Sequence, residues 1–286
     1  MSTAPASAVL EAGTLLAQAE ADLCSVTDTP RLEAELLLAE TAGITRAALM
    51  ARPARSIGAA DASRFEALVA RRCRGEPFAY LVGHREFYSL RLAVDPAVLV
   101  PRPETEILVD AALARLVKAN GSVLDLGTGS GAIALALKHE RGDLSITAVD
   151  CDDAALAVAQ ANAAAHALEI RWLKSNWYSA VASLRFDLIA ANPPYVASGD
   201  THFALSLAHE PRLALDGGAD GLDAYRAILR DAHSHLVPDG WLIVEHGFDQ
   251  REAVVELAEA SQLRLDAVLD DLAGLPRVAC FRPDLR

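Results

Sequence analysis

The residues best suited to chemistry are Asn192, Pro193, Pro194 and Tyr195, which directly follow an apolar run ending at Ala191. The two prolines fix two φ angles, lack N–H donors and favour an extended Pro193, so this segment is rigid and rich in hydrogen-bond acceptors. The side-chain oxygen of the asparagine and the carbonyl of Pro193 could accept both hydrogens of an –NH₂ group, with Tyr195 against its planar face. The pattern predicts a site for a planar amide or amine nitrogen, and a plain rigid turn is the alternative.

A second motif is a glycine-rich turn after the apolar run Val123–Leu126, made of Gly127, Thr128, Gly129, Ser130 and Gly131. Glycines permit positive φ and close backbone approach, and the helix expected to follow offers unpaired N–H groups. Asp150 ends the next predicted strand, where its carboxylate could accept both ribose hydroxyls of a nucleoside. Alternatively, Asp150 only caps the following helix. The turn predicts a nucleotide-like ligand, and its spacing also satisfies the dinucleotide-binding fingerprint.

The two motifs together favour S-adenosylmethionine over a dinucleotide, because a dehydrogenase has no use for the segment from Asn192 to Tyr195. Ligands of open α/β sheets lie at the carboxyl ends of the strands, so both motifs should face one crevice. An amide nitrogen is a poor nucleophile, and holding it in line with a sulfonium methyl at about 3 Å could recover roughly 7–11 kcal/mol of barrier. We therefore predict nitrogen methylation without a general base in the transition state.

Strands and helices alternate after Gly121, which predicts a mostly parallel sheet covered on both faces. The expected strands are 123–126, 146–150, 170–173, 186–190 and 241–244, and residues 263–269 and 278–281 could add a closing antiparallel pair. The expected helices are 103–118, 130–138, 153–167, 225–236 and one starting at Arg251.

The chain before this sheet has a different pattern. From Ala8 to about Arg74, apolar residues recur at spacings of three and four, which predicts a small domain of three to five helices. Alternation between Tyr80 and Pro101 predicts a short hairpin. The expected domains are therefore a helical domain over residues 1–79, a hairpin linker over 80–102 and a catalytic domain over 103–286. A chain of 286 residues exceeds the usual size of one domain, which favours such a division.

Composition narrows the possible partners and compartments. The net charge of −13 argues against a protein whose main affinity comes from neutralising phosphates. The first 22 residues lack a basic segment, and the chain lacks a run of about 20 apolar residues, so neither export nor a membrane span is expected. The four cysteines form no CxxC pair, and HExxH is absent, so we expect neither a metal site nor a disulfide framework. These features predict a cytoplasmic protein.

Several further segments complete a family resemblance. They are Arg85-Glu86-Phe87-Tyr88, Val100-Pro101-Arg102-Pro103-Glu104-Thr105-Glu106, His209-Glu210-Pro211 and Asp271-Leu272-Ala273-Gly274. With the glycine turn and Asn192–Tyr195, they make the chain resemble the HemK/PrmC family of peptide chain release factor glutamine methyltransferases, over nearly its whole length. The resemblance implies a helical substrate-recognition domain, a hairpin linker and a seven-stranded class I (Rossmann-like) S-adenosylmethionine-dependent methyltransferase domain.

The resemblance also implies a substrate and residue roles. Family members methylate the side-chain nitrogen, N5, of the glutamine in the Gly-Gly-Gln motif of class I release factors, which modulates translation termination and yields S-adenosylhomocysteine. Carried over by motif, Trp177 would flank the adenine, although a core role for this aromatic side chain competes. Asn192 would touch both ligands, and Asn192, Pro193 and Tyr195 would be catalytic. The cofactor would bind the turn and its surroundings, at Gly127, Thr128, Gly129, Ser130, Gly131, Asp150, Trp177 and Asn192.

Three rival functions remain open at this point. A nucleic-acid amino methyltransferase would present the same –NH₂ geometry from adenine N6, and the acidic charge disfavours it. A methyltransferase for a glutamine of a ribosomal protein is disfavoured by the Pro-Arg-Pro-Glu segment. A non-catalytic module that binds release factors is disfavoured by the intact glycine turn. We expect a monomer that does not bind nucleic acid directly, and we leave Glu104, Glu106, Glu210 and Glu245 without a role.

Overall fold

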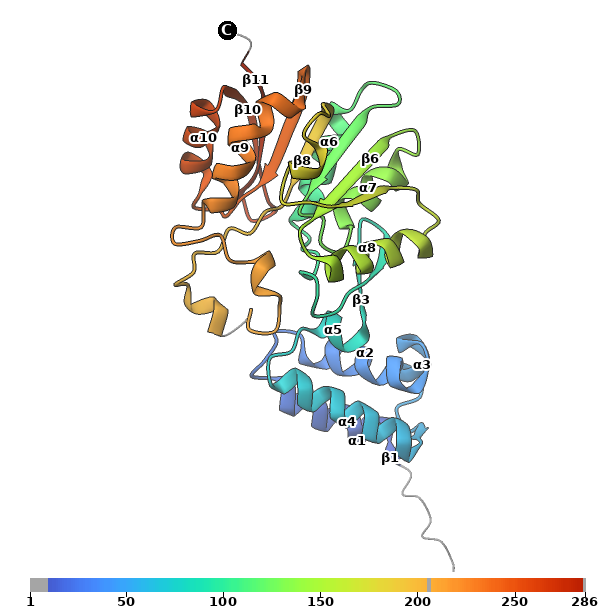
Figure 1. Cartoon of the computed structure of the whole chain (residues 1–286). Helices are drawn as coiled ribbons and strands as arrows, with labels where there is room; N and C mark the ends of the chain where they lie inside the picture. The colour runs from blue at the N-terminus through green and yellow to red at the C-terminus, as the bar shows by residue number, and fades with distance from the viewer. Residues whose placement is uncertain (1–9, 205–206, 285–286) are drawn as a thin grey trace, which may run out of the picture. The chain divides into compact units, whose positions relative to one another are not determined.

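The computed structural model describes residues 10–204 and 207–284, which fall into two units (Figure 1). The first unit contains the described residues up to Gly83 together with those between 202 and 209. The second runs from His84 to Thr201 and resumes at Glu210.

The first unit is helical, as its apolar spacing predicts. Its described elements are β1 (Leu10–Glu11), α1 (Ala12–Leu23), α2 (Pro30–Ala42), α3 (Arg46–Met50), β2 (Ser56–Ile57), α4 (Ala59–Cys73) and α5 (Phe78–Val82). The predicted pattern starts at Ala8, outside the described residues. The helices bury one leucine-rich core that includes Leu16, Leu37 and Phe65. Arg72 of α4 also pairs with Glu33 of α2, at 2.8 Å between Nε and Oε2.

A short hairpin opens the second unit, formed by β3 (His84–Phe87) and β4 (Leu90–Ala93). It is shorter than the alternation between Tyr80 and Pro101 predicts, because Tyr80 already lies in helix α5. Tyr88 and Ser89 both have positive φ, of 48° and 63°, as a two-residue turn between twisted strands requires. The apolar residues 98–100 are not part of the hairpin, since the Val100 N–H donates to the carboxylate of Glu210 at 3.0 Å.

The central sheet of this unit has the strand order β10-β11-β9-β8-β5-β6-β7. Neighbours from β9 to β7 are parallel, and β11 runs antiparallel to β9 and β10, which confirms the predicted closing pair. The strands are β5 (Ser122–Leu126), β6 (Ser145–Asp150), β7 (Arg171–Lys174), β8 (Phe186–Ala191), β9 (Leu236–Glu245), β10 (Leu263–Asp270) and β11 (Pro276–Pro283). The helices are α6 (Thr105–Arg115), α7 (Ala132–Glu140), α8 (Asp153–Ala165), α9 (Asp223–His235) and α10 (Arg251–Ala260).

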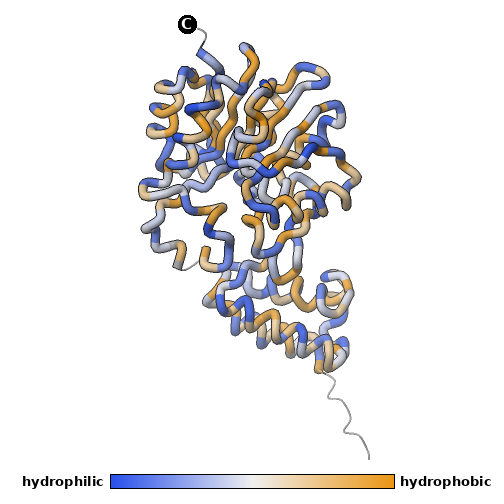
Figure 2. The backbone as a smooth tube through the Cα atoms, in the orientation of Figure 1, coloured by the Kyte–Doolittle hydropathy of each residue, from blue (hydrophilic) through white to orange (hydrophobic). Residues whose placement is uncertain are grey.

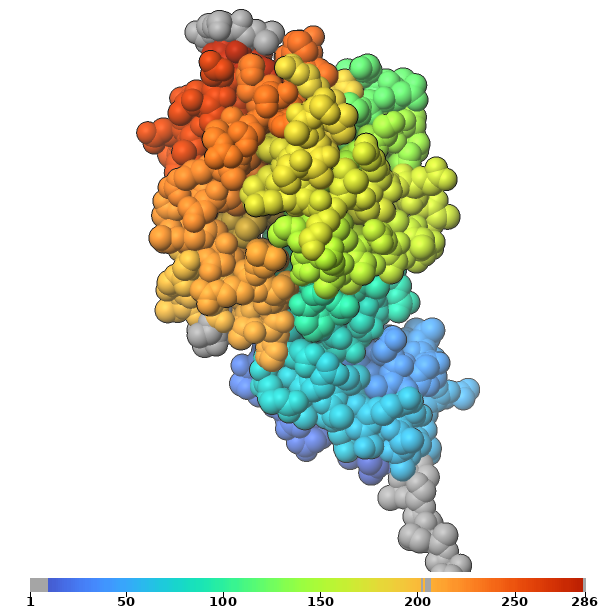
Figure 3. All heavy atoms as spheres, in the orientation of Figure 1, coloured from blue at the N-terminus to red at the C-terminus, as the bar shows by residue number. Residues whose placement is uncertain are grey.

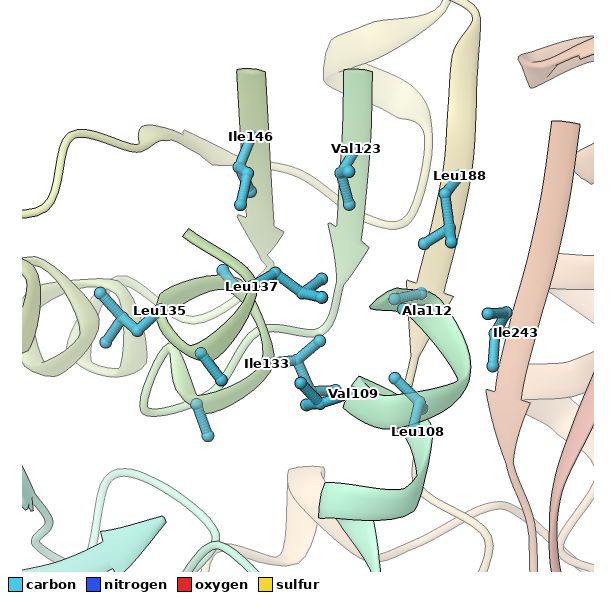
Figure 4. Packing of buried hydrophobic residues seen from close by; sticks show 14 of the residues in the cluster. Leu108, Val109, Ala112, Val123, Ile133, Leu135, Leu137, Ile146, Leu188 and Ile243 are labelled. Carbon is cyan, nitrogen blue, oxygen red and sulfur yellow. The ribbon is translucent and has the colours of Figure 1, made fainter. Parts of the chain in front are cut away.

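Helices cover both faces of the sheet, as the alternation predicts. Figure 4 shows side chains of α6 and α7 packed against Val123, Ile146, Leu188 and Ile243 on one face. Residues of α9 and α10 pack on the opposite face, against the intervening strand positions such as Leu124. Hydrophobic residues accordingly run along the central strands in Figure 2. A strand buried on both faces reads as a continuous apolar run, which is why these strands are recognisable in the sequence.

Helix α7 begins later than predicted, at Ala132 instead of Ser130. Gly131 precedes it with a φ of 85°, and a left-handed residue cannot belong to the helix. Among the described residues, no helix is long and apolar enough to cross a membrane.

Candidate active site

The two predicted motifs emerge side by side at the carboxyl edge of the sheet. Strands β5 and β8 are parallel neighbours, and Leu126 pairs with Ala191. The next residues, Gly127 and Asn192, therefore leave the sheet at the same level. This register brings the glycine turn and the Asn192–Tyr195 segment to one crevice, as the sequence predicts.

The glycine turn depends on backbone conformations that other residues adopt rarely. Gly127, Gly129 and Gly131 have φ angles of 69°, 54° and 85°. The N–H groups of Gly127 and Thr128 both donate to the Val149 carbonyl at 2.9 Å, which ties the turn to β6. At Gly129 an added Cβ would meet no atom of the described residues within 4 Å, so this part of the turn is open for a ligand.

Gly131 closes the packed side of the turn. A Cβ there would lie 3.0 Å from Leu135 Cδ1 and 3.2 Å from both Ala159 Cβ and Trp172 Cη2. We expect Gly131→Ala to lower the free energy of unfolding by about 1–3 kcal/mol, because it combines left-handed strain with overpacking. Urea denaturation of the variant and the parent measures this difference in the free energy of unfolding. Gly142→Ala is the matched control, since a Cβ there meets no described atom within 4 Å and is expected to leave stability nearly unchanged. Equal stability of both variants would contradict the expectation.

Asp150 ends β6 and supports the glycine turn. Its Oδ2 accepts a hydrogen bond from the Gly129 N–H at 2.9 Å, and its Oδ1 accepts one from the Asp152 N–H at 3.0 Å. The alternative that Asp150 caps the next helix is wrong, because Asp152 caps α8 by accepting from Ala154 N–H. Each carboxylate oxygen has two lone pairs, so Asp150 can also accept from a ligand.

Trp177 lies next to the glycine turn. It has a φ of 49°, and its Cζ3 would be 3.7 Å from a Cβ at Gly127. Its half-buried ring also packs against the core on the α9 side of the sheet. The sequence left open whether Trp177 lies at a ligand or in the core. The ring lines the cavity and also packs at the edge of the core.

A cavity of about 470 Å³ occupies this edge of the second unit, within the size range of small-molecule sites. In the space-filling view, yellow atoms border the orange atoms (Figure 3), and the segment after β7 and the 211–224 segment both supply lining residues. Eight residues assigned from the sequence line the cavity: Gly127, Thr128, Gly129, Ser130, Asp150, Trp177, Asn192 and Pro194. Gly131, Pro193 and Tyr195 adjoin them in the chain, outside the lining.

Tyr195 is held by its backbone and by burial. Its carbonyl accepts a hydrogen bond from Gln250 Nε2 at 3.0 Å, and burial raises the pKa of its hydroxyl to about 12. The hydroxyl is therefore a neutral donor and acceptor at neutral pH.

The Asn192 side chain is oriented by a residue that the sequence did not single out. Its Nδ2 donates to the hydroxyl of Thr105, the first residue of α6, at 3.0 Å. Thr105 itself lines the cavity, although its side chain is largely buried. In the sequence, only the position of Thr105 within the Val100–Glu106 segment pointed to a role in the site.

Two buried carboxylates also support the site. Glu210 accepts from the Val100 N–H and pairs with Arg102, so the segment after β4 is tied to the loop that precedes α9. Asp125 accepts from the Thr128 hydroxyl at 2.6 Å, and its pKa is raised to about 7, chiefly by burial. These carboxylates hold loops of the cavity.

The sheet order, with a closing antiparallel strand and a glycine turn after β5, defines the class I S-adenosylmethionine-dependent methyltransferase fold. The same fold occurs in a Pyrococcus furiosus methyltransferase, with a TM-score of 0.54 and 18% identity over 78% of this chain and 98% of that chain. It also occurs in a Thermus thermophilus 16S rRNA N2 G1207 methyltransferase in complex with AdoMet and guanosine, with a TM-score of 0.52 and 21% identity over 70% and 49% of the two chains.

Sequence comparison defines the family. The PrmC N-terminal domain matches residues 14–83, and the Methyltransferase small domain matches residues 103–212. A Coxiella burnetii release factor glutamine methyltransferase is 44% identical over 91% of this chain and 94% of its own length. A relative of the same name from Pseudomonas aeruginosa is 45% identical over 88% and 92% of the two chains. The chain belongs to the release factor glutamine methyltransferase family, as its motifs indicate.

Proposed function

We propose that this enzyme transfers a methyl group from S-adenosylmethionine to the side-chain amide nitrogen, N5, of the glutamine in the Gly-Gly-Gln motif of class I peptide chain release factors. The observation that carries the proposal is the position of Asn192, whose Nδ2 is bound by Thr105 while the residue lines the cavity beside the glycine turn. Its Oδ1 is then available to accept from a substrate –NH₂. The names of relatives at 44% and 45% identity support the same acceptor.

The cavity residues fit the cofactor. The open face at Gly129 admits a ligand close to the backbone, and Asp150 can accept from two ribose hydroxyls with its remaining lone pairs. We propose that Gly127–Gly131 bind S-adenosylmethionine together with Asp150, and that Trp177 flanks the adenine. The bound cofactor supplies an electrophilic methyl group on a sulfonium.

Asn192 and Pro193 hold the methyl acceptor in the proposed mechanism. Asn192 Oδ1 and the Pro193 carbonyl accept the two N–H bonds of the glutamine amide, and Tyr195 restricts its plane. These acceptors favour loss of conjugation between the amide nitrogen and its carbonyl, so the lone pair becomes available for attack. Positioning is expected to supply most of the rate enhancement. The proton leaves the nitrogen after methyl transfer, so no base is needed in the transition state.

The remaining parts of the proposal concern partners. We propose that the helical domain, predicted over residues 1–79, recognises the release factor, with residues 80–102 as the linker and 103–286 as the catalytic domain. We further propose a monomeric cytoplasmic enzyme without direct nucleic-acid binding. The net charge of −13 supports the last point, because nucleic-acid affinity rests mainly on neutralised phosphates.

Methyl transfer from labelled S-adenosylmethionine tests the function. We expect one methyl group per release factor, placed on the glutamine of the Gly-Gly-Gln motif by peptide mass spectrometry. The matched control is the same factor with that glutamine replaced by alanine, which should remain unlabelled. Label on oligonucleotides or on ribosomal protein, without label on the release factor, would contradict the proposal.

A further inference from the structure

Glu245 is a buried carboxylate that the proposed mechanism does not use. It ends β9, and its exposed fraction is 2%. Strand β9 is the parallel neighbour of β8, with Ala191 paired to Val244, so the next residues along the two strands are Asn192 and Glu245. The backbone carbonyl of Glu245 is fixed by the Tyr225 hydroxyl at 2.8 Å. The backbone of Glu245 is therefore held beside that of Asn192 at the carboxyl edge of the sheet.

Thr105 joins the two side chains. Its hydroxyl accepts from Asn192 Nδ2 at 3.0 Å, and hydrogen bonding from Thr105 and from Asn192 acts on Glu245. A hydroxyl has one proton, so a threonine that donates to the carboxylate offers only lone pairs to the amide. The Oε2 atom of Glu245 is also buried and without a hydrogen-bond partner among the described residues. Both groups that interact with the Asn192 amide, the Thr105 hydroxyl and the Glu245 carboxylate, thus act as acceptors toward it.

Acceptors on one side of an amide decide which end faces them. Turning the Asn192 amide by 180° would place Oδ1 against the Thr105 oxygen and the carboxylate, which is unfavourable because none of these oxygens would then donate. We propose that Glu245, acting on the amide both directly and through Thr105, is a positioning residue that holds the Asn192 amide with Nδ2 inward and Oδ1 toward the cavity. The inference rests on the proposed function, since it explains why the site selects an –NH₂ donor.

Ionisation of Glu245 is part of this device. Burial raises its pKa to about 7, while hydrogen bonds from Thr105 and the charge of Arg277 oppose the rise and Glu104 adds to it. The hydroxyls of Tyr195 and Tyr225 also face this carboxylate and stay neutral, because burial raises the pKa of both. Only the ionised form is acceptor-only, so lowering the pH through about 7 should release the amide orientation. In the parent, kcat/KM should therefore fall as the pH drops through about 7, and in Glu245→Gln part of this fall should disappear. The part that remains in Glu245→Gln belongs to other groups such as Asp125, whose pKa is also raised to about 7.

The test compares Glu245→Gln with Glu259→Gln, which changes an exposed glutamate of α10. For Glu245→Gln we expect kcat/KM for the release factor to fall on the order of tenfold, with S-adenosylmethionine affinity unchanged. Binding should also become less selective, so that the preference for Gly-Gly-Gln over Gly-Gly-Glu factor shrinks several-fold. Glu259→Gln should match the parent. Wild-type kcat/KM and selectivity in Glu245→Gln would overturn the inference.

A second pair of variants guards against loss of folding. Thr105→Val removes the hydroxyl and Thr105→Ser keeps it, so the serine variant should retain more activity. Because Glu245 acts partly through Thr105, the double variant Thr105→Val/Glu245→Gln should lose less activity than the sum of the two single losses, whereas additive losses would overturn the coupling.

A spectroscopic readout keeps the inference separate from the proposed function. The Asn192 side-chain amide signals, assigned by their loss in Asn192→Asp, should exchange with solvent faster in Glu245→Gln than in the parent. Unchanged exchange would count against the inference even if methylation occurs. An unlabelled Gly-Gly-Gln factor, combined with the expected change in exchange, would instead count against the proposed substrate.

Discussion

Asn192→Ala is expected to lower kcat for methyl transfer by about 10²–10³-fold, the loss that follows removal of one fixed hydrogen-bonding group at a reacting centre. The variant removes Oδ1, the proposed acceptor for the glutamine –NH₂. Of the two proposed acceptors, only the Pro193 carbonyl then remains. It also frees the Thr105 hydroxyl, which Nδ2 contacts at 3.0 Å in the parent. Single-turnover transfer of labelled methyl measures the change without interference from product release.

Controls separate this loss from misfolding. Gln160→Ala removes an exposed side-chain amide from α8 and should leave kcat unchanged. The thermal midpoint of Asn192→Ala should stay within a few degrees of the parent, because Asn192 is half-buried and belongs to no hydrophobic cluster of the described residues. Turnover equal to the parent would remove Asn192 from the mechanism.

Asp150→Ala is expected to weaken S-adenosylmethionine binding at least about a hundredfold. Two charge-assisted hydrogen bonds to ribose hydroxyls contribute roughly 1.5–3 kcal/mol each, and both are lost. The variant also leaves the Gly129 N–H without its 2.9 Å acceptor, so the open part of the glycine turn loses support. Calorimetric titration with S-adenosylmethionine and with S-adenosylhomocysteine measures the effect on both ligands.

Asp153→Ala provides the matched comparison. This neighbouring carboxylate starts α8, is largely exposed and pairs with Lys174, so its removal should change affinity less than twofold. Asp150→Asn, which keeps one oxygen for the backbone, should lie between the two. Parent-like affinity in Asp150→Ala would mean that Asp150 serves only the turn.

The fold was predictable because the central strands are buried on both faces. Residues such as Val123, Ile146 and Leu188 belong to continuous apolar runs, and helices with their own spacing separate those runs. The errors lie at element ends, where local geometry decides. Gly131 delays α7 through its left-handed backbone, and Val100 is not part of the hairpin because its N–H binds Glu210.

The candidate site was predictable only in part. Register made the glycine turn and Asn192 neighbours, as strand order in such sheets requires. Thr105 and Glu245 were missed as partners of Asn192, because a buried threonine or glutamate carries no local signal of its neighbours. Asp150 was found, but its bond to the Gly129 N–H was not.

The sequence by itself determined what depends on local backbone chemistry. Glycines permit the left-handed turn, paired prolines stiffen the segment after β8, and apolar periodicity sets the order of strands and helices. Only the tertiary structure decided which end of the Asn192 amide faces the cavity. That orientation depends on Thr105 and Glu245, which come from α6 and β9 and reach the amide through helix packing and the pairing of β8 with β9. Contacts between residues so distant in the chain follow from the assembled sheet, and no short stretch of sequence encodes them.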